Sequence, residues 1–366
     1  MTAARPGAGG ADGPAAAGGA PLLAIRDLAI DFGTPQDPQP AVRGIDLTVA
    51  QGRTLGIVGE SGSGKSMSML SVVSLLPETA RVSGSVQLAG REMLGLGPRE
   101  LRKIRGSQVG MIFQDPMTSL NPVFTVGDQV GEAIRTHEPG LSRRKARARA
   151  IELLADVSIP RPAERARSYP FELSGGMRQR VMIAIAIANN PALLIADEPT
   201  TALDVTIQAQ ILELLKRLVD ERNVGLIVIS HDLGVVAGVV DRVAVMYAGR
   251  IVEDAPVDEL FAAPRHPYTR ALLGCTPRLD RPNVSLTPIP GAPPVLSALH
   301  GGCSFRARCG YRQPRCEDED PVLQPAGRSQ AACLFADEIS AQPALQVRPA
   351  APGGPAAPAA TEEAAS

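Results

Sequence analysis

The sequence GESGSGKS at residues 59–66 fits the pattern GxxxxGK[ST], and an apolar run at residues 54–58 comes directly before it. In this pattern a strand leads into a glycine-rich loop whose backbone N–H groups surround the β- and γ-phosphates of a nucleotide. A helix expected over residues 65–76, and stopped by Pro77, directs its positive end at the same anion. The sequence therefore predicts a nucleotide-binding α/β protein. The predicted phosphate-loop residues are Gly59, Glu60, Ser61, Gly62, Ser63, Gly64, Lys65 and Ser66, of which Lys65 adds charge and Ser66 can bind Mg²⁺.

The composition of the 366-residue chain indicates a globular protein with two tails. A hydrophobic content of 44% is enough for a substantial core in one large domain or two ordinary ones. Residues 1–20 are rich in Ala, Gly and Pro, and residues 340–366 in Ala and Pro, so both segments are predicted to be disordered. The net charge of −1 gives no general attraction to nucleic acid or anionic lipid.

Two features argue against a membrane span and a secretion signal. The longest clean apolar run, residues 181–188, is too short to cross a bilayer, and residues 1–20 lack the apolar core of a signal peptide. We therefore expect a cytosolic protein, or one attached to a membrane only through a partner.

Gln114 follows a short apolar strand expected over residues 108–113. A glutamine at such a strand end can face bound Mg²⁺ and water and sense the γ-phosphate. The alternative is a loop amide that bonds only to the backbone.

The segment LSGGM at residues 173–177 opens an apolar helix that we expect to reach residue 188. Ser174, Gly175 and Gly176 place a hydroxyl and free amides at the positive end of the helix dipole, which suits a phosphate. The alternative is an ordinary serine N-cap followed by glycines that only shape the turn.

Asp197 and Glu198 follow a buried strand expected over residues 193–196, at the edge where ligands bind in open α/β sheets. Two adjacent carboxylates there are costly unless they are paired or bind a metal. Asp197 would hold Mg²⁺ through water, and Glu198 would orient or deprotonate the attacking water. Further along, the ALD segment contributes Asp204, and a strand over residues 226–229 leads to His231, which is suited to contact the γ-phosphate or to a structural role.

These motifs occur in the order and approximate spacing of the ATP-binding cassette ATPases of ABC transporters, and the chain resembles that family over roughly residues 22–258. The resemblance implies an α/β P-loop NTPase at residues 21–258, with a RecA-like parallel-sheet core, an antiparallel β subdomain and a helical subdomain at about residues 115–185. Within the helical subdomain, Ser142 is expected to cap a basic helix. The family stacks an aromatic side chain on the adenine, and Phe32 is the candidate here. Met177 departs from the glutamine usual in the wider family.

The same resemblance implies that two cassettes pair head to tail, so that each signature segment completes the other's ATP site. ATP would join the pair and hydrolysis would release it. When ATP closes the pair of cassettes, the movement must act on a membrane protein. That protein must be a separate chain, because no membrane span is expected in this one.

Residues 265–273, RHPYTRALL, resemble the start of the C-terminal extension of oligopeptide and dipeptide importer ATPases, which also favour the LSGGMRQR form of the signature. We assign this small Cys-rich extension to residues 259–339. His266 and Tyr268 are expected to form a helix-entry turn with a packed aromatic side chain.

Four cysteines fall within this extension: Cys303, Cys309, Cys316 and Cys333. Four thiolates can ligate one metal centre and stabilise a segment with little core. Their gaps of five, six and sixteen residues do not match the two-residue spacing common in zinc ribbons. The resemblance to peptide importers implies a [4Fe–4S] cluster, with Zn²⁺ or unligated thiols as the alternatives.

The leading hypothesis is the ATP-hydrolysing subunit of a bacterial di- or oligopeptide importer at the cytoplasmic face of the inner membrane. The implied partners are a second, homologous ATPase in a heterodimer, two permeases and an extracytoplasmic peptide-binding protein, with no nucleic acid. Nickel importers share this branch, so the solute stays open. The alternatives from other classes are a soluble ABC ATPase that acts on nucleic acid and a cassette that binds ATP without turnover.

Overall fold

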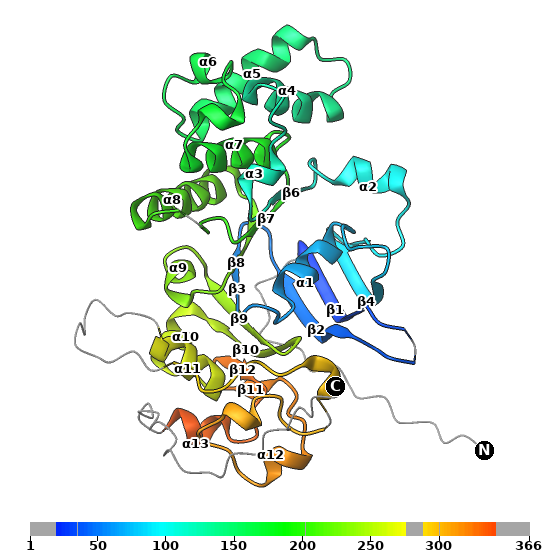
Figure 1. The fold of residues 1–366 in the computed structure, drawn as a ribbon, viewed down its shortest axis with the longest axis vertical. Helices are drawn as coiled ribbons and strands as arrows, with labels where there is room; N and C mark the ends of the chain where they lie inside the picture. Colours follow the sequence, from blue (N-terminus) through cyan, green and yellow to red (C-terminus); the bar gives the residue numbers. More distant parts are fainter. Residues whose placement is uncertain (1–19, 35, 202, 276–287, 300, 342–366) are drawn as a thin grey trace, which may run out of the picture.

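The computed structural model describes residues 20–34, 36–201, 203–275, 288–299 and 301–341 (Figure 1). The tails predicted at residues 1–20 and 340–366 lie, except for their innermost residues, outside these described ranges. Two sheets and a layer of helices make up the described structure, as the predicted fold class requires.

The main sheet has eight strands in the order β11-β12-β10-β9-β3-β8-β7-β6. The five strands from β9 to β6 are parallel, and β10, β12 and β11 continue the sheet in antiparallel fashion. The parallel strands are apolar along almost their whole length because helices cover both faces. Their carboxyl ends meet at one edge, where the polar motifs lie. The bounds are β3 Thr54–Val58, β6 Val109–Ile112, β7 Leu193–Asp197, β8 Gly225–Ser230, β9 Arg242–Tyr247, β10 Arg250–Pro256, β11 Gln324–Ala326 and β12 Ser329–Ala331.

A second, antiparallel sheet has the order β2-β1-β4-β5. Its strands alternate between the core and solvent, as in β2, where Ile45, Leu47 and Val49 are buried and the residues between them are exposed. Its buried side chains form one cluster with the main-sheet residues Leu55 and Ile57. The bounds are β1 Leu23–Asp31, β2 Pro40–Val49, β4 Arg81–Leu88 and β5 Arg91–Glu92.

The helix after the phosphate loop, α1 (Lys65–Val72), is shorter than the predicted 65–76. The chain leaves the helix at Ser74, whose φ of 50° is left-handed. Pro77 also disfavours helical geometry for the residue before it, so a continuous helix up to the proline was a wrong prediction.

The segment between β6 and β7 is helical, and Figure 1 shows it at the end of the molecule farthest from the C-terminal extension. Ser142 caps α5 by accepting a hydrogen bond from the Lys145 N–H, as predicted. The buried residues of α5 recur with helical spacing and pack in the large core cluster with α4 and α7. The helices between β6 and β7 are α3 Pro116–Ser119, α4 Val126–His137, α5 Arg143–Asp156, α6 Pro162–Arg165, η1 Pro170–Glu172 and α7 Gly175–Ile187. Outside this segment lie α2 Pro98–Ile104, before β6, and α8 Val205–Arg222 and α9 Leu233–Ala237, after β7.

The C-terminal extension is continuous with the main sheet. β12 pairs with β10, joining Glu253 to Ala331 and Asp254 to Gln330, so it covers a strand that would otherwise form an open edge. Short helices surround these strands: α10 Val257–Ala262, α11 Pro267–Cys275, η2 Leu296–Ala298, η3 Arg306–Arg308, α12 Arg315–Asp318 and α13 Ala336–Ser340.

Within the described ranges, no helix is both long and apolar enough to cross a bilayer.

A buried turn anchors the extension to β10. Glu253 is fully buried and its carboxylate accepts hydrogen bonds from the N–H groups of Arg265 (2.7 Å) and His266 (2.8 Å). His266 Nδ1 in turn accepts from the N–H of Tyr268 at 3.0 Å. Burial raises the pKa of Glu253 to about 7 and lowers the pKa of His266 to about 3. The helix-entry turn with a packed tyrosine is therefore present as predicted.

We predict that His266 makes an unfavourable contribution to stability in acid, opposite in sign to that of Glu253, whose raised pKa favours the folded state as the pH falls below 7. The unfolded chain binds a proton at this imidazole below about pH 6.5 whereas the folded chain binds it only near pH 3, so acid favours unfolding. His266→Asn keeps an acceptor for the Tyr268 N–H but does not titrate. Urea unfolding at pH 7.5 and pH 5 should show wild type losing on the order of 2 kcal/mol more than the variant. An equal loss in both proteins would contradict this role.

Candidate functional site

The phosphate loop joins β3 to α1 and holds Lys65 close to its own backbone. The Lys65 Nζ donates hydrogen bonds to the carbonyls of Gly59 (2.7 Å) and Glu60 (2.9 Å). The side chain is buried, and burial lowers its pKa while the charges of Glu198, Asp197 and Glu60 raise it. The ammonium therefore lies among the loop carbonyls with nearby carboxylates to balance it.

Two glycines of this loop are required by their contacts. A Cβ on Gly59 would lie 2.1 Å from the carbonyl oxygen of Met246, at the end of β9. Gly64 has a φ of 100°, and a Cβ there would lie 2.6 Å from the Ala41 carbonyl oxygen. The loop backbone thus packs directly against both sheets.

Ser66 and Asp197 form the candidate Mg²⁺ site. The Ser66 Oγ donates to Asp197 Oδ1 at 3.0 Å, and Asp197 is mostly buried. Burial raises the pKa of Asp197, and the hydrogen bond from Ser66 lowers it. Among the described residues no group of three or more His, Cys, Asp or Glu side chains is arranged to hold a metal. A hydroxyl and one carboxylate still suit Mg²⁺, because this ion takes most of its ligands from phosphates and water in nucleotide sites.

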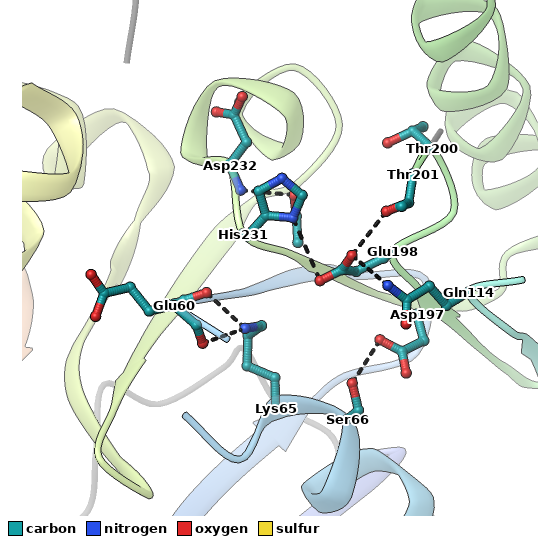
Figure 2. Close-up of polar contacts among 12 residues, drawn as sticks. Glu60, Lys65, Ser66, Gln114, Asp197, Glu198, Thr200, Thr201, His231 and Asp232 are labelled. Carbon is teal, nitrogen blue, oxygen red and sulfur yellow. Dashed lines mark hydrogen bonds and ion pairs between the residues drawn. The ribbon is translucent and has the colours of Figure 1, made fainter. Parts of the chain in front are cut away.

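Glu198 is the centre of a polar cluster beside the phosphate loop (Figure 2). Its Oε2 accepts hydrogen bonds from Gln114 Nε2 (2.9 Å) and Thr201 Oγ1 (2.8 Å), and its Oε1 lies 3.5 Å from His231 Nδ1. Glu198 has a left-handed φ of 45°, a backbone conformation that costs energy and is often found at functional sites. Its side chain is 18% exposed, whereas that of His231 is 64% exposed.

The structure therefore brings together Lys65, Ser66, Gln114, Asp197 and Glu198, with His231 at the rim, from the ends of four parallel strands. Sequence reasoning did not identify Thr201. Its only signal was its position three residues after Glu198, in the loop that follows β7.

The signature residues lie apart from this cluster. Ser174 caps α7 by accepting from the Met177 N–H at 3.3 Å, and Asp204 caps α8 by accepting from the Ile207 N–H at 3.0 Å. The two caps are neighbours, because a Cβ on Gly176 would lie 2.8 Å from Ile207 Cγ2. Figure 1 shows α7 in a different layer from α1. Ser174, Gly175, Gly176 and Asp204 are therefore not part of the cluster around Glu198 in this chain.

Phe32 lies just after β1 and packs, partly buried, against the cluster of the second sheet. Its role in adenine binding remains a prediction.

The four cysteines of the extension line one apolar pocket, together with His266, Phe305, Tyr311 and Phe335. None of these four cysteines is joined to another in a disulfide. Burial, strengthened by the neighbouring cysteines, raises the pKa of Cys309 to about 11 and that of Cys333 to about 12. The predicted convergence is present, but no ligand set of three or more side chains is formed among the described residues. Only a bound metal draws thiolates together to ligand distances, so protonated thiols lie farther apart.

The strand order and the residues at the strand ends place the chain among the P-loop nucleotide-binding proteins. Residues 42–201 match the ABC transporter family, and residues 252–316 match the C-terminal region of oligopeptide/dipeptide transporters. A dimeric ATP-binding cassette solved with ADP and phosphate superposes with a TM-score of 0.58 at 30% identity, over 64% of this chain and 99% of the other.

The oligopeptide transport ATP-binding protein OppD of Mycobacterium tuberculosis is 52% identical over 91% of this chain and 56% of its own length. A putative peptide import ATP-binding protein of Brucella abortus is 49% identical over 86% of this chain and 95% of its own length. OppD of Salmonella typhimurium is 48% identical over 82% and 90%, respectively. The chain belongs to the family of ABC transporter ATP-binding proteins that contains these relatives. It spans little more than half the length of the mycobacterial one.

We predict that Gly59→Ala disrupts the phosphate loop. The added methyl would have to displace either the loop or the Met246 carbonyl, at a cost of about 1–3 kcal/mol, and would move the backbone N–H groups away from the phosphates. Nucleotide affinity, measured with a fluorescent ATP analogue, should fall at least tenfold. Gly238→Ala is the control, since its Cβ meets open space at an ordinary φ of −81°. Equal affinities in the two variants would contradict the packing argument.

Proposed function

We propose that this chain is the ATP-hydrolysing subunit of an ABC importer for di- or oligopeptides. The observation that carries the proposal is the Glu198 carboxylate, which is held by Gln114 and Thr201 beside the phosphate loop and faces His231. The match of the extension to oligopeptide/dipeptide transporters and the names of the relatives favour peptides over nickel. The intact Glu198 and His231 argue against a cassette that binds ATP without turnover.

Each residue of the site has a role that its position supports. The phosphate-loop N–H groups and Lys65 bind the phosphates, and Ser66 with Asp197 would hold Mg²⁺, which neutralises phosphate charge when bound. Glu198 orients the attacking water and accepts its proton, while Gln114 fixes the carboxylate. His231, exposed at the rim, donates to the γ-phosphate. Catalysis of this kind depends mainly on positioning and charge, which the strand ends provide.

A second, homologous ATPase completes the site in this proposal. Ser174 and Asp204 are exposed helix caps that lie away from the cluster around Glu198. The backbone N–H groups at the starts of α7 and α8 are therefore available to a nucleotide on a partner chain. The dimeric cassette found by structural comparison supports such a pairing. A heterodimer with a homologous subunit is the arrangement that we propose.

An exposed apolar surface supports binding to two permease subunits. Met117, Val123 and Phe124 follow Gln114 and are more than half exposed, as is Phe171. The hydrogen bond from the Val126 N–H to the Ser168 carbonyl, 2.9 Å, brings the two segments together. Apolar side chains gathered in this way commonly mark a protein interface. The chain would thus lie at the cytoplasmic face of the inner membrane, attached through permeases that receive peptide from an extracytoplasmic binding protein.

The cysteine pocket is proposed to hold a [4Fe–4S] cluster. Four thiols from separate segments converge on one apolar pocket, and thiolates are the ligands that such a cluster requires. Ligation would demand deprotonation, against the raised pKa values of Cys309 and Cys333, so cluster binding should release protons and draw the thiols together.

We predict that Glu198→Gln abolishes turnover but preserves ATP binding. The amide keeps the shape of the side chain and its contact with Gln114 but cannot accept the proton of the attacking water, so kcat should fall by about 10²–10⁴-fold. Phosphate release and fluorescent ATP binding would be measured in parallel. Glu213→Gln, an exposed change on α8, is the control. Unchanged turnover in Glu198→Gln would refute the assigned role.

We predict that anaerobically purified protein contains about four irons and four sulfides per chain. Cys309→Ser should lose them, whereas Cys275→Ser, whose thiol does not line the pocket, should keep them. Iron, sulfide and zinc analysis with an absorption spectrum makes the measurement. One zinc and no iron would refute the iron–sulfur cluster.

A further inference from the structure

The phosphate loop is held from outside by a residue 248 positions later in the chain. Arg308, at the end of η3, donates from Nη1 to Glu60 Oε2 (2.7 Å) and from Nη2 to Glu60 Oε1 (2.9 Å). The Arg308 side chain is 5% exposed and that of Glu60 is 25% exposed. Two parallel, charge-assisted hydrogen bonds fix both the distance and the orientation of the pair. Figure 2 shows the Glu60 side chain directed away from Lys65, so its carboxylate is not the partner of the ammonium.

Arg308 is itself fixed on several sides. Its Nε donates to the Pro290 carbonyl at 2.8 Å, and its Nη1 lies 3.4 Å from the Tyr247 hydroxyl. The rings of Tyr247 and Phe305 lie within about 6 Å of its guanidinium. The arginine therefore presents a rigid fork to Glu60.

A second group of the extension holds the Glu60 backbone. The Tyr268 hydroxyl accepts a hydrogen bond from the Glu60 N–H at 2.8 Å. Tyr268 is fully buried, and its ring packs against Tyr247 and Phe305 with centroids 4.6 and 5.4 Å apart. Arg308 and Tyr268 thus share one aromatic cluster and reach the same residue of the loop.

We propose that Arg308 and Tyr268 are positioning residues for the phosphate loop, which set the Glu60 peptide group and through it the site for ATP. The Glu60 N–H donates to the Tyr268 hydroxyl. The Glu60 carbonyl oxygen accepts hydrogen bonds from Lys65 Nζ at 2.9 Å and from the Ser63 N–H at 3.2 Å. A rotation at Glu60 would therefore displace Lys65 and the amides that surround the phosphates. The inference rests on the proposed ATP-binding function and adds to it residues outside the nucleotide-binding motifs.

The test is a double-mutant cycle on the full-length chain with Arg308→Gln, Glu60→Gln and the double variant. Removing one partner leaves the other charge poorly solvated, whereas replacing both leaves two neutral groups, so a true bridge gives strongly non-additive effects. Equilibrium binding of a fluorescent ATP analogue with Mg²⁺, and KM and kcat for ATP, would be measured. Arg312→Gln is the control, because Arg312 is an exposed residue of the extension that pairs with Glu317.

Arg308→Gln should weaken ATP binding and raise KM at least tenfold, with kcat changed less than threefold. In the double variant the fold-increase in the dissociation constant of ATP should be smaller than the product of the two single fold-increases. The dissociation constant of the control variant should stay within twofold of wild type. A purely structural role for Arg308 would lower the melting temperature without changing KM in the folded protein, and this result would overturn the proposal. The proposal would also be overturned if the fold-increase in the double variant equalled the product of the two single fold-increases.

Two milder variants keep the test decisive if Arg308→Gln does not fold. Arg308→Lys keeps the charge but loses the fork, and Tyr268→Phe keeps the ring but loses the acceptor for the Glu60 N–H. Each should raise the dissociation constant of ATP several-fold, and unchanged affinity in both would refute the role. A wild-type chain that binds ATP without hydrolysing it would contradict the proposed function, while the binding measurements would still decide whether the bridge positions the loop.

Discussion

The close packing of the phosphate-loop backbone is the constraint on which the rest of the structure depends. Gly59 approaches the end of β9 so closely that no side chain fits, and Gly64 turns the chain into α1 beside the second sheet. The shape of the loop therefore depends on both sheets. The order of the parallel strands then sets which polar residues reach the loop, since each of β6, β7 and β8 delivers its last residues to the same edge.

Much of this arrangement could be predicted from the sequence. The strands leading to Lys65, Asp197 and His231 are short apolar runs followed at once by polar residues, so their ends were placed to within about one residue. The cap at Ser142 was equally accessible, because a cap depends on residues only three positions away. The cap at Ser174 is the one that stood as the alternative to phosphate binding. Local pattern and burial are sufficient for features of this kind.

Contacts between distant segments were not predictable in the same way. Nothing near Arg308 indicates that it bonds to Glu60, and nothing in the short strand β12 indicates that it pairs with β10. Both depend on how the whole chain is arranged. Thr201 was missed because its only signal was its position three residues after Glu198. The length of α1 was overestimated because Ser74 turns left-handed before the proline. The cysteine pocket lies between these cases: its members were identified, but their spacing in the chain does not determine their distances.

The pairing of β12 with β10 also has a consequence for biosynthesis. β10 ends at Pro256, whereas β12 begins at Ser329, so more than seventy residues must leave the ribosome before β10 acquires its outer neighbour. During that interval the nascent cassette presents an unpaired strand edge, which is a recognised route to aggregation. A chaperone that shields nascent strands would therefore be most useful to this protein late in translation, after the motifs for nucleotide binding have already been synthesised.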